Sequence, residues 1–251
     1  MASLRESKHL PSKLSSLYLM ELTNWRWSWR SMIVLGAVSP IASVVFLAAA
    51  FHPLSLDDRQ RIAVGVLMLA FLFENFHRVA GHYAFMRHHG TLEYYESLPV
   101  DRWMVLAAVM ASFFTLSLLP ITATFIAATV YLNLPLVVAP EAMLVLMVVA
   151  LPISAMAAAI GVLARSGSEA TSIATVVTIG LVSSGSVILR EQAIPGVLRT
   201  LGEVNPISHA AGYLRGALYK GQAVDPIFVM STLAMAIILF VWLERHLELF
   251  G

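Results

Sequence analysis

Long runs of hydrophobic residues alternate along this chain with short polar segments. A run of about 20 apolar residues is long enough to cross a bilayer as a helix. This pattern predicts six transmembrane helices, at residues 32–51, 62–86, 102–132, 142–164, 168–189 and 226–243. Hydrophobic residues make up 59% of the chain and charged residues only 12%, which is low for a soluble domain. The fold class that follows is an all-α polytopic membrane protein, with residues 1–251 in a single transmembrane domain.

A helical apolar pattern precedes the first run. Pro11 and Ser12 are typical of a helix start, and we expect the polar residues before them to be loosely structured. Apolar residues then recur at helical spacing at Leu14, Leu17, Tyr18, Leu22, Trp25 and Trp29. Because Trp and Arg suit the headgroup level, we expect residues 12–30 to form a helix that lies in the membrane surface. A plain juxtamembrane helix that anchors the first span agrees with the same pattern.

The second predicted span becomes polar before it ends. Glu74, Arg78 and His82 follow one another at intervals of four residues and therefore share one helical face. Only about 12 apolar residues, or ~18 Å of helix, precede them, so we expect these side chains to begin within the inner leaflet. Ionisable groups at that depth face protein or a wet cavity. They are candidates for a cytoplasmic gate or substrate entrance, and an ion pair that closes the helix bundle is an equal alternative.

A polar segment at residues 87–101, which we call the elbow, separates the second and third predicted spans. Gly90 is typical of a helix end, Thr91 of a helix cap, and Glu93 of a first helical turn. Asp101 is placed to cap the third span. The pattern predicts a short, rigid helix held between two membrane helices. An ordinary interfacial loop helix would show the same pattern.

A second long interruption, residues 190–222, follows the fifth predicted span. It contains two short amphipathic pieces divided by Asn205 and Pro206, and the second piece carries Gly212 and Gly216 at a spacing of four. Each piece is too short to cross a membrane. A re-entrant segment and a surface-lying connector are equally consistent with this pattern, on the extracytoplasmic side of the membrane.

The distribution of positive charge predicts the orientation. With six spans, ten of the 16 Lys and Arg residues fall on the side of the two termini and six on the other side. Since positive residues are enriched in cytoplasmic loops, we expect a multi-pass protein of the cell membrane with both termini in the cytoplasm. The net charge of +1 and the lack of any Lys/Arg run argue against a nucleic-acid partner.

Sequence motifs for catalysis are missing. The chain has no cysteine, no G-x-x-x-x-G-K-[ST] phosphate loop and no H-E-x-x-H, so we expect neither catalytic residues nor a metal site. Serines near the end of the fifth span, among them Ser184 and Ser186, would need a His base at matching depth to act as nucleophiles. His209 lies in the connector instead, which disfavours an intramembrane protease.

Two motifs carry a resemblance to a known family. The elbow contains Gly90-Thr91-Leu92-Glu93 followed by Leu98-Pro99-Val100 and Arg102. The connector contains Asn205-Pro206-Ile207, with Pro195 before it and Leu214-Arg215-Gly216 after it. Both segments, together with the amphipathic N-terminal helix and six-span layout, resemble ABC-2 type transporter permeases. This family includes polysaccharide, nodulation-factor and daunorubicin-type drug exporters.

The resemblance implies a permease subunit without its own ATPase. It implies two separate ABC ATPase subunits per complex, which bind ATP and Mg, and a second permease copy in a homodimer or related heterodimer. It makes the elbow the coupling helix that docks on the ATPase, with Gly90, Thr91, Leu92, Glu93, Tyr94, Tyr95 and Glu96 as its residues. The chain departs from the family after the fifth span, where residues 185–189 replace the usual Gly-Phe/Tyr-Pro turn.

Two other functions remain open on the same resemblance. One is a non-transporting membrane partner of an ABC ATPase in signalling or envelope regulation. The other is a haem-handling permease of cytochrome maturation, although no obvious axial-ligand site is visible in the sequence. Neither the transported substrate nor its class follows from these residues.

Overall fold

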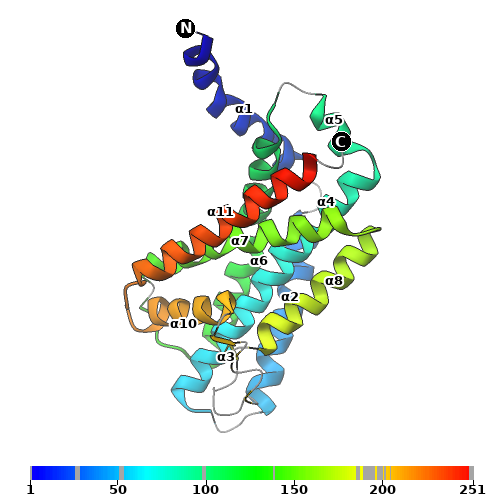
Figure 1. The fold of residues 1–251 in the computed structure, drawn as a ribbon. Helices are drawn as coiled ribbons and strands as arrows, with labels where there is room; N and C mark the ends of the chain where they lie inside the picture. The colour runs from blue at the N-terminus through cyan, green and yellow to red at the C-terminus, as the bar shows by residue number, and fades with distance from the viewer. Residues whose placement is uncertain are drawn as a thin grey trace.

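The computed structural model describes residues 2–25, 29–50, 54–97, 100–137, 139–184, 187–188, 196, 200, 202–203 and 205–248. Within these residues helices are the only regular secondary structure, as the fold class predicted (Figure 1). In chain order they are α1 (Ala2–Asn24), α2 (Trp29–Ala50), α3 (Leu56–Phe71), the π-helix η1 (Leu72–His77), α4 (Arg78–His88), α5 (Thr91–Glu96), α6 (Arg102–Leu132), α7 (Glu141–Leu163), α8 (Gly167–Ser183), α10 (Pro206–Tyr219) and α11 (Pro226–Glu248).

Four stretches of helix are long and apolar enough to cross a membrane. They are Leu56–His88, Arg102–Leu132, Glu141–Leu163 and Pro226–Arg245, and they correspond to the second, third, fourth and sixth predicted spans. The first and fifth predicted spans coincide with α2 and α8. There the described apolar helices are shorter, since one covers Gly36–Ala50 and α8 has 17 residues, or about 25 Å of helix. The six-span layout therefore stays a prediction at these two positions.

The N-terminal helix differs from its prediction. It begins at Ala2, whereas residues 1–12 were expected to be loose and Pro11 to mark the start. From Lys13 onward α1 packs against α6, and the hydroxyls of Tyr18 and Thr115 lie 2.9 Å apart. Residues 12–24 of the predicted interfacial helix form the second half of α1, whereas its last two residues, 29–30, begin α2.

The second span contains a π-helix that the sequence pattern did not predict. Ser55 caps α3 by accepting from the Asp58 backbone N–H at 3.2 Å, and the Asp58 carboxylate accepts from the Ser55 N–H in return. The helix then runs without a break through η1 into α4. A π-turn inserts an extra residue and rotates the side chains that follow it, and such turns are frequent at functional sites.

Helix α7 lies at the centre of the bundle and packs against α4, α10 and α11 (Figure 1). Its small residues allow this close packing. A Cβ on Gly161 would overlap the Ala80 carbonyl of α4 and would lie 2.7 Å from Cβ of Tyr83. Close approach between α4 and α7 therefore requires glycine at this position.

The molecule has two distinct ends. Helices α1 and α5 and the C-terminal end of α11 lie at one end, while the start of α3 lies at the other (Figure 1). Both described termini thus share the end that carries the elbow, as an even number of spans requires.

Candidate coupling site and intramembrane ion pair

Helix α5 is fixed between α4 and α6 by a turn at Gly90. Gly90 has a φ of 68°, in the left-handed region that glycine tolerates best. Its carbonyl accepts from the Tyr94 N–H at 3.1 Å, so that α5 begins at Thr91, which is the first helical residue rather than its cap. Asp101 stands at the N-cap of α6 with extended backbone, yet its side chain makes no capping hydrogen bond. The predicted elbow helix is present, with its caps made by backbone groups.

The two tyrosines of α5 have opposite environments. Tyr95 is 5% exposed, and its hydroxyl donates a hydrogen bond to the Glu21 carboxylate of α1 at 2.7 Å. Tyr94 is 58% exposed. Leu92 is half-buried against the core, while the side chains of Glu93 and Glu96 lie outside the described residues. Of the predicted docking residues, Tyr94 is the one whose described side chain is open to a partner.

Glu21 joins three helices. It is 2% exposed, accepts from Tyr95 of α5 with one carboxylate oxygen, and has the other 3.4 Å from Nε2 of His82 on α4. Trp25 and Phe113 pack edge-on against the His82 ring, with centroids at 6.0 and 5.1 Å. His82 therefore faces Glu21 on α1, whereas Glu74 and Arg78 pair with each other. A π-helix, η1, contains Glu74 and ends just before Arg78.

Burial and hydrogen bonding oppose each other at Glu21. Burial raises the pKa of this carboxyl, but the contacts with His82 and Tyr95 outweigh it and hold the pKa below its ordinary value of 4.5. Burial, and then the hydrogen bond to Glu21, raise the pKa of the Tyr95 hydroxyl. Glu21 is therefore a carboxylate that accepts, and Tyr95 a phenol that donates.

The prediction did not include Glu21, although the sequence contains a signal for it. Glu21 stands four residues after Leu17 and four before Trp25, in the middle of the apolar stripe of α1. An acid at such a position must find a buried partner. The stripe identified the face of α1 that packs on the bundle, but not the partner.

Glu74 and Arg78 form the predicted ion pair. Arg78 Nε lies 2.7 Å from Glu74 Oε2, and the Glu74 and Arg78 side chains are 8% and 24% exposed. The Glu74 carboxylate also lies against α2, where Gly36 leaves room for it: a Cβ on Gly36 would overlap this carboxylate. Helix α2 thus covers the Glu74 carboxylate, whereas the Arg78 side chain is partly exposed.

The π-helix directs successive polar residues toward different helices. Next to Glu74, the Asn75 amide oxygen accepts from the Ser154 hydroxyl of α7 at 2.7 Å. His77 Nε2 lies 3.0 Å from the Thr175 hydroxyl of α8. Together these contacts connect η1 to α7 and α8.

The connector is held by Asn205. Its amide oxygen accepts from the Ile207 N–H at 2.9 Å and caps α10, while Pro206 occupies the first helical turn. Its amide nitrogen donates to the Leu181 carbonyl and to the Ser184 hydroxyl, which marks the end of α8. These bonds join α10 to α8, so the Asn-Pro motif has a packing role in addition to capping.

The two connector glycines differ from each other. Gly212 has open space around its Cβ position, whereas a Cβ on Gly216 would lie 2.9 Å from the Gln222 side-chain oxygen. The buried face of α10 packs on α3, α7 and α8. The predicted first amphipathic piece of the connector, around residues 194–201, lies mostly outside the described residues.

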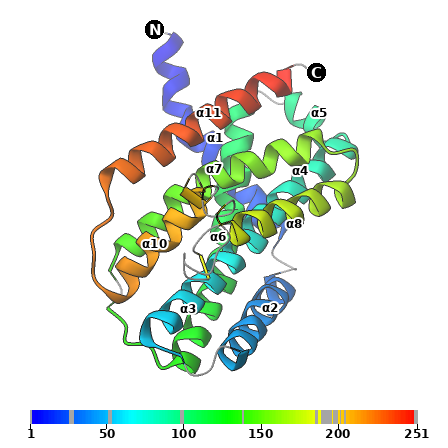
Figure 2. The same cartoon turned by 60° about the horizontal axis from the view of Figure 1, so that its bottom comes forward.

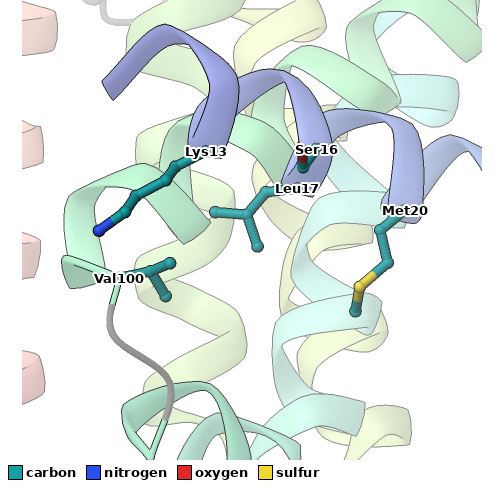
Figure 3. A pocket seen from close by; sticks show the side chains of 5 residues that line it. All are labelled: Lys13, Ser16, Leu17, Met20 and Val100. Carbon is teal, nitrogen blue, oxygen red and sulfur yellow. The ribbon is translucent and has the colours of Figure 1, made fainter. Parts of the chain in front are cut away.

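Two of the hollows between the described helices differ in size and lining. A small one of about 280 Å³ lies beside α1, close to the segment that leads into α6, and it is lined by Lys13, Ser16, Leu17, Met20 and Val100 (Figure 3). A larger one of about 540 Å³ lies between α6, α7 and α11 and is almost wholly apolar. No group of three or more His, Asp or Glu side chains in the described part of the chain is arranged to hold a metal ion.

Comparison with known proteins identifies the family. The family model for ABC-2 type transporters matches residues 15–219, from the middle of α1 to the end of α10. No curated protein matches the chain. The match includes the elbow, the Glu74–Arg78 pair and the Asn205 connector, and it covers well over half of the sequence. The chain therefore belongs to the ABC-2 type transporter family, the multi-pass membrane permease components of ABC transporters.

Proposed function

We propose that this chain is the permease subunit of an ATP-driven exporter and that a separate ATPase subunit docks on α5. The observation that carries the proposal is the pair of opposite tyrosine environments on this helix. Tyr95 is buried against Glu21 and fixes α5 to the membrane domain, while Tyr94 is exposed. A helix that must transmit force needs both a firm attachment and a free contact surface.

Motion of α5 would reach the membrane domain by two routes. One is covalent, through the Gly90 turn into α4. The other is the buried contact of Tyr95 with Glu21, which also faces His82 of α4. Because Glu21 lies on α1, displacement of α5 would shift the interfacial helix and the second span together.

The Glu74–Arg78 pair is the proposed cytoplasmic gate. Intramembrane ionisable groups are costly, and many of them lie on substrate or ion pathways. The pair lies on a π-helix, and Arg78 keeps part of its side chain exposed. Exchange of the two charges, Glu74→Arg with Arg78→Glu, should impair transport if either charge contacts substrate. Normal transport by the variant with exchanged charges would show that the pair has only a structural role.

The complex would contain two ATPase subunits, which hold ATP and Mg, and two permease copies. Both termini and α5 would face the cytoplasm, where the ATPase resides. The grouping of α1, α5 and the end of α11 at one end of the molecule supports this orientation (Figure 1).

Substitution of Glu93 and Tyr94 by Ala tests the docking site. We expect less ATPase to co-purify with the permease and less permease-stimulated ATP hydrolysis. Tyr131→Ala is the matched control, because Tyr131 is 51% exposed and lies near the far end of α6. Unchanged co-purification and unchanged ATP hydrolysis in the double variant would refute docking at α5.

A further inference from the structure

A group of basic residues lies at the end of the molecule opposite α5. It is formed by the start of α3 and the second half of α10, two helices that pack against each other (Figure 2). Its members are Arg61 on α3 and Arg215 and Lys220 on and after α10, arranged around Asp57. Positive residues are disfavoured on the side of a membrane protein away from the cytoplasm. In the proposed orientation, these positive residues therefore lie on the unfavourable side of the membrane, and a binding function would explain why they are there.

The arginines of α3 already have acceptors within the protein. Arg61 Nε lies 2.7 Å from Asp57 Oδ2, and the Arg61 and Asp57 side chains are 20% and 45% exposed. Arg59 donates to the Leu132 carbonyl at the end of α6, at 3.5 Å. The Asp57 carboxylate is thus already paired with the Arg61 guanidinium.

Arg215 lacks such an acceptor. Among the described residues its guanidinium makes no hydrogen bond and no ion pair, although the residue is half-buried. Burial, and then the positive charge of Arg61, lower the pKa of Arg215, while Asp57 acts in the opposite direction. The two guanidinium groups repel each other, and a further anion beside them would offset this repulsion.

The charges of this group do not balance. Arg61, Arg215 and the exposed Lys220 are all within electrostatic range of Asp57, so three cations share one carboxylate. The excess equals two positive charges. A phosphate group would offset this excess and would supply the oxygen acceptors that Arg215 lacks, since guanidinium and phosphate form paired hydrogen bonds.

We propose that Arg215, with Arg61 and Lys220, forms a binding site for a phosphate group. This phosphate group belongs either to the headgroup of an anionic phospholipid or to a soluble phosphate compound. The site lies away from α5 and from the Glu74–Arg78 pair, so it is independent of the proposed coupling function. Asp57 holds the Arg61 side chain in place and sets an upper limit on the charge of the bound anion.

The test uses the whole protein in a neutral maltoside detergent at low ionic strength, with melting temperature as the measurement. Two probes are titrated separately: inorganic phosphate against chloride at equal ionic strength, and short-chain phosphatidylglycerol against short-chain phosphatidylcholine. We expect the phosphate-bearing anion to raise the melting temperature above its control. Arg215→Gln should require at least about tenfold more probe for the same rise, because it loses charge-assisted hydrogen bonds.

The unliganded proteins separate a binding role from a structural one. Without probe, Arg215→Gln should melt no lower than the wild type, since it removes repulsion from Arg61. Arg165→Gln, which removes an exposed cation between α7 and α8, should respond to the probes like the wild type. If Arg215→Gln fails to fold, Lys220→Gln, at the exposed end of α10, carries the same test with a weaker response expected.

The outcomes also show whether the bound phosphate group belongs to a lipid or to a soluble compound. A response to phosphatidylglycerol alone assigns the site to a lipid headgroup, and a response to inorganic phosphate assigns it to a soluble phosphate group. The proposal is overturned if neither probe exceeds its control, or if the folded Arg215→Gln or Lys220→Gln protein responds as the wild type does.

Discussion

The Tyr95 hydroxyl and the Glu21 carboxylate meet at 2.7 Å in a buried contact between α5 and α1. The two residues are 74 positions apart in the chain. Because both side chains are buried, α5 cannot move away from α1 without leaving a carboxylate short of one donor. If an ATPase docks on α5 as proposed, this contact would transmit movement of α5 to α1.

Replacement of Tyr95 by Phe should weaken this attachment. The variant keeps the ring but removes the donor, and a buried hydrogen bond to a charged group is worth about 1.5–3 kcal/mol. We expect a lower melting temperature and weaker permease-stimulated ATP hydrolysis. Tyr94→Phe is the matched control, because it removes a hydroxyl from the exposed tyrosine next to it and should leave stability unchanged. Equal stability of the two variants would show that the contact contributes nothing.

Glu21 should make stability depend on pH in the acid range. Its pKa in the folded protein lies below 4.5, so the unfolded chain binds more protons between the two values. The stabilisation is fully present above pH 4.5 and is lost as the pH falls through the folded pKa. The difference in melting temperature between the wild type and Glu21→Gln should therefore shrink as the pH drops below 4.5. A difference that stays constant through this range would argue against an ionised Glu21.

Gly36→Ala should disturb the Glu74–Arg78 pair from the neighbouring helix. The added methyl group would overlap the Glu74 carboxylate, which cannot rotate away without leaving Arg78. Overpacking of this kind costs about 1–3 kcal/mol. Thermal unfolding of Gly36→Ala can be compared with that of Gly180→Ala, whose Cβ position has no neighbour within 4 Å. Combining Gly36→Ala with Glu74→Ala should remove the overlap, so the double variant should lose less stability than the two single variants together. Additive losses of stability would show that the added methyl group does not overlap the Glu74 carboxylate.

Asn205→Asp should separate capping of α10 from its attachment to α8. Aspartate keeps the oxygen that accepts from the Ile207 N–H but loses the nitrogen that donates to Leu181 and Ser184. We expect a loss of about 1–3 kcal/mol, since buried acceptors lose their donor. Asn205→Ala should cost about 1 kcal/mol more, because the cap is lost as well. If Asn205→Asp is as stable as the wild type in unfolding measurements, Asn205 contributes to stability only by capping α10.

Local patterns predicted the parts of this protein that depend on near neighbours. The Glu74–Arg78 pair follows from a spacing of four residues within one continuous helix, and α5 follows from the glycine and polar residues at its ends. The ends of α6 agree with the predicted span at residues 102–132, because polar residues stand at both its limits. Hydrophobic run length was enough to predict the class of membrane protein. The elbow and connector motifs, with the N-terminal helix and the six-span layout, were enough to predict its family.

Tertiary structure decided which partners the predicted faces meet. Periodicity places Glu21 on the packed face of α1, but only the fold brings it to Tyr95 and His82. The second span contains a π-turn, and no spacing rule signals such a turn in advance. The same holds for Arg215, which has no hydrogen bond or ion pair among the described residues and whose neighbour Arg61 comes from α3, far away in the chain. A sequence determines which side of a helix is buried, whereas the packing of helices determines what each buried group contacts.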